Sequence, residues 1–128
     1  MFRLLGRRMR VQGRPLLLLT TTGAKTGRRR ETTLGWFPDE ERGNGSRLIV
    51  ASNAGAAAHP SWYVNLARLP DGAAIEVDGH KFAVSAESLH GAERERAWKR
   101  VVALAPGYGK YGQQTDREIP VVRLTPKA

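Results

Sequence analysis

The chain has 128 residues, and 41% are hydrophobic, which is enough for one domain with a packed core and too many for a disordered chain. It contains no cysteine, which excludes disulfides, iron–sulfur clusters, zinc ribbons and thiol nucleophiles. The net charge of +9 arises near the start: residues 1–30 hold nine Arg or Lys and no acid, whereas residues 31–128 hold twelve of each. A nucleic-acid binder usually spreads its basic residues over a face of the fold, so this placement argues against a nucleic-acid partner.

Residues 1–14 are predicted to form a basic arm ahead of a single domain over residues 15–128. The arm mixes apolar residues with arginines (MFRLLGRRMRVQ for residues 1–12). This pattern fits either an amphipathic helix in peripheral contact with an anionic membrane surface or a segment that packs on the fold. No apolar run approaches the roughly 20 residues that cross a bilayer, and no signal peptide is apparent. We expect a cytoplasmic protein, peripheral to the inner membrane face in the first alternative.

The segment from Leu16 to Trp36 is predicted to be a hairpin. Four leucines and three threonines favour a buried strand, Gly23–Gly27 favour a tight turn, and the run from Glu31 resumes as a second strand. The tip is crowded with cations, which destabilise one another unless an anion binds, and its glycines let backbone N–H groups approach that anion. The sequence therefore predicts either a phosphate or polycarboxylate site or a solvated basic turn, built on Lys25, Arg28, Arg29 and Arg30.

Beyond the hairpin, residues 38–46 read as a polar turn with the hairpin signal Asn44-Gly45, and residues 47–52 as a third strand. Residues 53–58 read as a loop of small residues. Such a loop either lets a flat ligand lie close to the backbone or serves as a flexible connector.

A helix is predicted to begin at His59-Pro60 and to end before Pro70-Asp71-Gly72. Its apolar stripe comprises Trp62, Tyr63, Leu66 and Ala67. Residues 73–78 and 81–85 then predict a second hairpin around Gly79-His80.

An amphipathic helix is predicted over residues 91–105. Its expected inward residues are Ala97, Trp98, Val101, Val102, Leu104 and Ala105, and its expected solvent-facing residues are Glu93, Arg94, Glu95, Arg96, Lys99 and Arg100. Residues 106–116 read as a glycine-rich loop and residues 117–124 as the closing strand. About six short strands with two inserted helices indicate a small antiparallel barrel with helices at its ends.

The order of these motifs resembles the deazaflavin-dependent nitroreductase family. The matching pieces are LLLLTTTGAKTGRRR, VASNAGAAAHPSWYVNL, GAERERAWKRVVALAPGY and TDREIPVVRL, which together span nearly everything after Gly13. The resemblance implies a mainly β (α+β) fold: a split β-barrel of about six antiparallel strands with two to three helices, similar to FMN-binding oxidoreductases. It implies coenzyme F420 as cofactor and hydride transfer to a quinone-like, nitro or other electrophilic acceptor.

The resemblance also implies where the cofactor binds. Lys25 and Arg30 match cations that pair with the cofactor's phosphate, Thr26 and Gly27 lie in the same turn, and Arg28 with Arg29 is expected at the glutamate tail. The ring is expected along Ser52, Asn53, Ala54 and Gly55, then Trp62 and Asn65. From the residues alone, Trp62 also fits a core position, and the Asn65 amide needs partners that could equally be backbone groups.

For catalysis, the resemblance implies acceptor-side tyrosines at Tyr108 and Tyr111, with Ser52 as a further donor. The alternative is that the tyrosines only cover the barrel end. Ala105 and Gly35 depart from the family pattern, in which tyrosines are common at these two positions. The resemblance therefore does not determine the identity of the acceptor. The histidines at 59, 80 and 90 have no metal-ligand spacing, so no metal is expected. The rival interpretations are an FMN-binding or non-catalytic split barrel and a basic nucleic-acid-binding barrel. The sequence is compatible with either a monomer or a homodimer.

Overall fold

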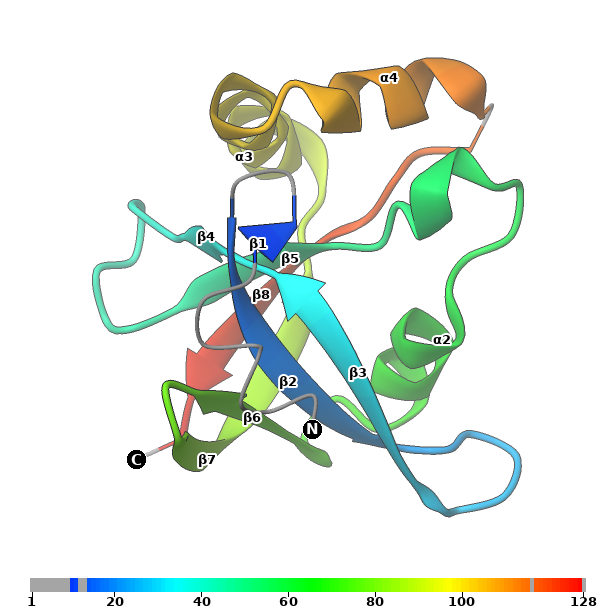
Figure 1. The fold of residues 1–128 in the computed structure, drawn as a ribbon, viewed down its shortest axis with the longest axis vertical. Helices are drawn as coiled ribbons and strands as arrows, with labels where there is room; N and C mark the ends of the chain where they lie inside the picture. Colours follow the sequence, from blue (N-terminus) through cyan, green and yellow to red (C-terminus); the bar gives the residue numbers. More distant parts are fainter. Residues whose placement is uncertain (1–9, 12–13, 116, 128) are drawn as a thin grey trace.

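The computed structural model describes residues 10–11, 14–115 and 117–127 (Figure 1). Within these residues the strands alternate with three α-helices and one 3-10 helix. Their order is β1 (Arg10–Val11), β2 (Arg14–Thr22), β3 (Arg29–Gly35), β4 (Phe37–Pro38), β5 (Arg47–Val50), η1 (Asn53–Gly55), α2 (Ser61–Arg68), β6 (Ala73–Val77), β7 (His80–Ser88), α3 (Gly91–Leu104), α4 (Gly107–Gln114) and β8 (Val121–Pro126). The predicted arm, residues 1–14, lies largely outside the described residues.

Every strand pairing in the described chain is antiparallel, as the short connections predicted. The sheet runs β1-β2-β6-β7-β8-β5-β4. The strand β3 lies outside this order and also pairs with β2. The β2–β3 hairpin is confirmed, with Leu16 opposite Gly35 and Thr22 opposite Arg29. Its turn extends away from the body of the sheet and lies beside α2 (Figure 1).

Two apolar clusters hold the helices against the sheet. The first joins Leu17 and Leu19 of β2 to Trp62 and Leu66 of α2. The second joins Leu48 of β5 to α3 and α4, which lie together at one end of the sheet (Figure 1). The helix α2 and the two C-terminal helices therefore pack on different parts of the sheet. Of these helices, α2 is the one that lies beside the basic turn.

Residues 107–114 were predicted to be a glycine-rich loop, and this prediction is wrong: they form the helix α4. Three glycines in eight residues give this segment a poor helix propensity. Burial overrides that propensity, because Tyr108 packs edge-on against Phe37, with ring centroids 5.7 Å apart, and against Tyr111 at 5.6 Å.

Some predicted helix faces and boundaries also need correction. Ala67 and Leu104, expected inside, are exposed, whereas Arg94, expected in water, is buried and donates to the Ile119 carbonyl at 2.6 Å. The guanidinium of Arg94 also stacks on the Trp98 ring, which makes a buried position favourable.

The other differences are local. Residues 53–55 of the predicted loop form a 3-10 helix, and Pro60 caps α2 instead of occupying its first turn. The second hairpin turns at Asp78-Gly79, both at positive φ, and His80 already belongs to β7. An Asp-Gly pair suits such a turn because both central residues must be left-handed.

Candidate functional site

The β2–β3 turn is a compact loop that carries exposed cations. The Gly23 N–H donates to the Arg28 carbonyl at 2.7 Å, and the Gly27 N–H donates to the Gly23 carbonyl at 2.9 Å. Gly27 has φ +72°, a conformation that side chains other than glycine rarely adopt. Lys25 and the three arginines that follow the turn are exposed, so their charges are available to a ligand.

Asn65 connects this turn to α2. Its Oδ1 accepts the Ala24 N–H at 2.9 Å, and its Nδ2 donates to the Thr21 hydroxyl at 3.2 Å. The side chain is buried, so both halves of the amide are satisfied within the protein. Of the two roles that the sequence left open, the structure gives Asn65 the backbone partner.

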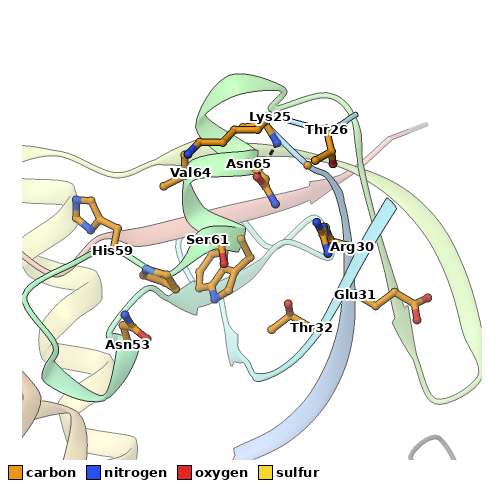
Figure 2. Close-up of a pocket in the computed structure, with 14 residues that line it drawn as sticks. Lys25, Thr26, Arg30, Glu31, Thr32, Asn53, His59, Ser61, Val64 and Asn65 are labelled. Atoms are coloured by element: carbon orange, nitrogen blue, oxygen red, sulfur yellow. Dashed lines mark hydrogen bonds between the residues drawn. The ribbon is translucent and has the colours of Figure 1, made fainter. Parts of the chain in front are cut away.

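A cleft of about 1000 Å³ opens between the turn, β3 and the start of α2. Figure 2 shows Lys25 and Thr26 beside Asn65, Arg30 on β3, and Asn53 with His59 at the opposite end. Six of the predicted cofactor-binding residues line it: Lys25, Thr26, Arg30, Asn53, Trp62 and Asn65. Gly27, Arg28, Ser52 and Gly55 lie outside the set of described residues that line it, and the side chain of Ala54 is not among those that the structure describes.

The cleft also contains residues that the sequence analysis did not select. These are Gly23, Ala24, Glu31, Thr32, His59, Pro60, Ser61 and Val64. The signal for Thr32 was present, since residues 30 and 32 share one face of a strand. The signal for His59 and Ser61 was the predicted helix start. These residues lie close to Trp62 in sequence, so a cleft that contacts Trp62 is expected to contact them as well.

Trp62 occupies a core position and faces the cleft as well. It is buried in the first apolar cluster and also lines the cleft. The indole therefore gives the cleft an apolar wall. Asn53 and His59 line the end of the cleft opposite Lys25, which is called the neutral end below (Figure 2).

The neutral end of the cleft is held by Arg117, which the sequence analysis did not single out. Its guanidinium donates to the carbonyls of Ser52 at 2.7 Å, Ala56 at 3.0 Å and Ala51 at 3.1 Å. Its Nη1 also lies 3.1 Å from His59 Nδ1. Because these contacts are mostly to backbone atoms, no side-chain pattern in residues 51–58 signals them.

His59 is the titratable group of this end. Partial burial and the neighbouring Arg117 charge both lower the pKa of its imidazole. The ring also packs against Tyr63 of α2, with centroids 4.9 Å apart. The imidazole is therefore neutral at ordinary pH.

Of the predicted catalytic residues, Tyr108 and Tyr111 contact each other on α4, whereas Ser52 belongs to a different element. Ser52 lies at the start of η1, where its carbonyl is bound by Arg117. Tyr108 and Tyr111 lie on α4 within the second apolar cluster, outside the described lining of the cleft. Burial raises the pKa of Tyr108, Tyr111 adds to the rise and Arg14 opposes it, so the phenol stays protonated.

Together these features describe a binding site for an elongated anion with a flat, neutral head. Cations gather at one end, the Asn53 amide and the His59 imidazole lie at the other end, and the Trp62 indole adds an apolar wall. Among the described residues, no three His, Asp or Glu side chains gather to hold a metal ion, and no helix is long and apolar enough to cross a membrane.

Known proteins share both the sequence and the fold. The family model described as F420H(2)-dependent quinone reductase matches residues 4–126. An F420H(2)-dependent quinone reductase of Mycobacterium tuberculosis is 41% identical over 114 residues, covering 87% of this chain and 73% of the relative. A solved F420-H2 dependent reductase has a TM-score of 0.74 and 38% identity, covering 87% of this chain and 94% of the other. A second solved structure, a domain-swapped dimer, has a TM-score of 0.75 and 38% identity over 87% of this chain and 80% of the other.

Proposed function

This chain belongs to the F420H(2)-dependent quinone reductase family, and we propose that its cleft binds the deazaflavin cofactor with Lys25 and Arg30 at the anionic tail. The protein is a split-barrel oxidoreductase that uses coenzyme F420 and transfers a hydride from the reduced cofactor to a quinone. The observation that carries the assignment of the cleft is the placement of both cations in it, beside an apolar wall.

The residues present fit such a cofactor. F420 has a phosphodiester and a glutamate tail, so it is a long polyanion attached to a flat ring. An added Cβ at Gly23 would lie 2.9 Å from Thr26 Oγ1 and 3.2 Å from the Arg28 carbonyl, so glycine lets the turn that carries these cations close tightly. Arginine suits the phosphate because its planar fork donates two parallel hydrogen bonds, and lysine adds a point charge.

The protein's contribution to the reaction is position and charge. The bound cofactor supplies the hydride. Lys25 and Arg30 fix the tail, Trp62 supplies the apolar wall, and the neutral end is left for the ring and the acceptor. Holding donor and acceptor in contact supplies much of the rate, because it removes the entropy cost of their encounter.

Several finer features stay predictions. They are the catalytic roles of Ser52, Tyr108 and Tyr111, reduction of nitro compounds, and the division after residue 14. Further cofactor contacts also stay predictions, at Thr26, Gly27, Arg28, Ser52, Asn53, Ala54, Gly55, Trp62 and Asn65. We also propose a cytoplasmic location. A homodimer is one expected state, since one solved relative is a domain-swapped dimer. The predicted membrane contact through residues 1–12 falls largely outside the described residues.

The proposal is tested by replacing the two cations of the cleft. Lys25→Ala/Arg30→Ala should weaken F420 binding strongly, and Arg30→Ala alone should cost about 1.5–3 kcal/mol, the scale of a charged hydrogen bond. The loss should shrink as salt rises, because ions screen exposed charges over about 8–10 Å at ordinary ionic strength. Titration of F420 absorbance at low and high salt measures this.

The matched control is Arg28→Ala/Arg29→Ala, which removes the same charge from the same turn but not from the lining of the cleft. We expect this control variant to lose less F420 affinity, because Arg28 is predicted to contact only the glutamate tail. Equal affinity losses in the two double variants would show that net charge alone attracts the cofactor. Unchanged affinity in Lys25→Ala/Arg30→Ala at low salt would refute the phosphate site.

A further inference from the structure

Arg117 and His59 form a connected unit at the neutral end of the cleft. The guanidinium uses Nε, Nη1 and Nη2 to hold three carbonyls of residues 51–56. It reaches them from the segment that precedes β8, so it fixes the loop between β5 and α2. The same Nη1 lies 3.1 Å from His59 Nδ1. Arg117 therefore contacts both the loop and His59, which lines the cleft.

This contact determines where the imidazole carries its proton. A guanidinium has five donors and no acceptor, so Nδ1 must accept the hydrogen bond from Arg117. A neutral imidazole that accepts at Nδ1 carries its proton on Nε2. In the described part of the chain, the ring interacts with the Arg117 guanidinium and the Tyr63 ring, and both interactions leave Nε2–H available. His59 is exposed and lines the cleft, so this N–H is a donor at its neutral end.

We propose that His59, held by Arg117 as its Nε2–H tautomer, binds a carbonyl oxygen of the redox pair at this end of the cleft. The inference rests on the proposed function, because the basic turn takes the tail and thereby directs the ring and the acceptor toward Asn53 and His59. Both the deazaflavin ring and a quinone present carbonyl oxygens. His59 is thus a binding residue, and Arg117 is its positioning residue.

The protein without cofactor provides the first test. The chain has three histidines, so an imidazole ¹⁵N–¹H spectrum of the labelled full chain is simple, and His59→Gln identifies the signal of interest. We expect His59 to show a protonated Nε2 and an unprotonated Nδ1. Arg117→Gln should remove this preference and raise the pKa of His59, because one cause of its depression is gone. A mixed tautomer in the wild type would overturn the proposal.

Titration with ligands gives the second test. Oxidised F420 is added first, with its absorbance reporting binding, and then menadione as the quinone. A shift of the Nε2–H signal with F420 alone assigns the carbonyl to the cofactor, whereas a shift that needs menadione assigns it to the acceptor. No shift with either, while absorbance shows bound F420, overturns the proposal. No binding of F420 at all would overturn the proposed function as well.

Kinetic variants separate binding from packing. His59→Phe keeps a ring against Tyr63 but removes the donor, and His59→Gln keeps a donor near the position of Nε2. We expect His59→Phe to lower F420 affinity or the kcat/KM for menadione about tenfold, the size of an ordinary hydrogen bond, and His59→Gln to restore most of it. The control is His80→Phe, on β7 and outside the described lining of the cleft. Equal rates and affinities in His59→Phe and the wild type would contradict the proposal.

Discussion

Asn65 shows how one buried amide organises a charged site. Its two hydrogen bonds run from the middle of α2 to Thr21 at the end of β2 and to Ala24 in the basic turn. Helix and turn are 41 residues apart in sequence at this contact. The cations of the turn are therefore held at a fixed distance from Trp62, on the same helix, and this sets the width of the cleft.

Replacing Asn65 separates support of the turn from direct contact with the cofactor. Asn65→Ala leaves the Ala24 N–H and the Thr21 hydroxyl without a partner, so we expect a loss of about 1–3 kcal/mol in the free energy of unfolding. Asn65→Asp keeps an acceptor for the Ala24 N–H but places a negative charge beside the cations. It should preserve more stability and lose more F420 affinity, by an amount that salt reduces. Urea unfolding without cofactor and F420 titration at two salt concentrations measure both effects.

Asn44 provides the control for this pair. Its Oδ1 accepts from the Ser46 N–H at 3.3 Å in the turn between β4 and β5, outside the lining of the cleft in the described chain. Asn44→Ala should leave F420 affinity unchanged. An Asn65→Ala protein as stable as the wild type would show that the two bonds contribute nothing.

At the scale of elements, patterns within short windows predicted most of the strands and helices. Turn residues between two strand-like runs defined the β2–β3 and β6–β7 hairpins, and the apolar stripe defined α3. The helix α4 could not be predicted in this way, because its glycines favour a loop and only its tertiary contacts make it helical. The same holds for η1, which packs against α4 through Gly55 and Gln114.

The contact between η1 and α4 can be tested with one substitution in each element. Gly55 has φ +81°, and an added Cβ would lie 2.3 Å from Gln114 Oε1 and 3.2 Å from Gln114 Cβ. Gly55→Ala should therefore destabilise the fold by about 1 kcal/mol or more, since an alanine is strained in this conformation before any clash is counted.

Gly109→Ala, on α4, should have the opposite sign. Its Cβ would meet Val102 Cγ1 at 3.5 Å, an ordinary contact, and alanine raises helix propensity by about 1 kcal/mol over glycine. Thermal unfolding of both variants measures the difference. A stabilising Gly55→Ala would contradict the contact between η1 and α4, and a destabilising Gly109→Ala would contradict the helical packing of α4 against Val102 of α3.

Across the whole molecule, the two ends of the cleft differ in how far the sequence could reveal them. The cationic end lies within one hairpin, so neighbours in sequence supply its chemistry and the residues alone indicate it. The neutral end is assembled from the loop after β5 and from Arg117, which are about 60 residues apart and bound through backbone carbonyls. The pairing of such distant segments has no local signature, so the sequence does not indicate that His59 lines the cleft or contacts Arg117.

A second distant pairing holds the whole fold together and involves a buried charge. Arg123 of β8 is 1% exposed, contacts the buried Asp39 after β4, and donates to Glu93 of α3 at 2.8 Å and to Glu87 of β7 at 3.0 Å. Four segments therefore meet at one guanidinium. Removing it leaves the Asp39 carboxylate buried without its partner, which typically costs 3–5 kcal/mol.

Arg123→Met should accordingly lower the free energy of unfolding by about 3–5 kcal/mol, measured by urea unfolding at neutral pH. Arg123→Met/Asp39→Leu should recover much of this loss, because the charge that lacked a partner is gone as well. Arg96→Met is the matched control: Arg96 pairs with Glu41 at 2.9 Å but is exposed, so its replacement should leave the free energy of unfolding nearly unchanged. If the double variant were as unstable as Arg123→Met, the lost stability would come from the packing of the arginine stem. The four segments would then be held together by packing and not by the ion pairs of Arg123.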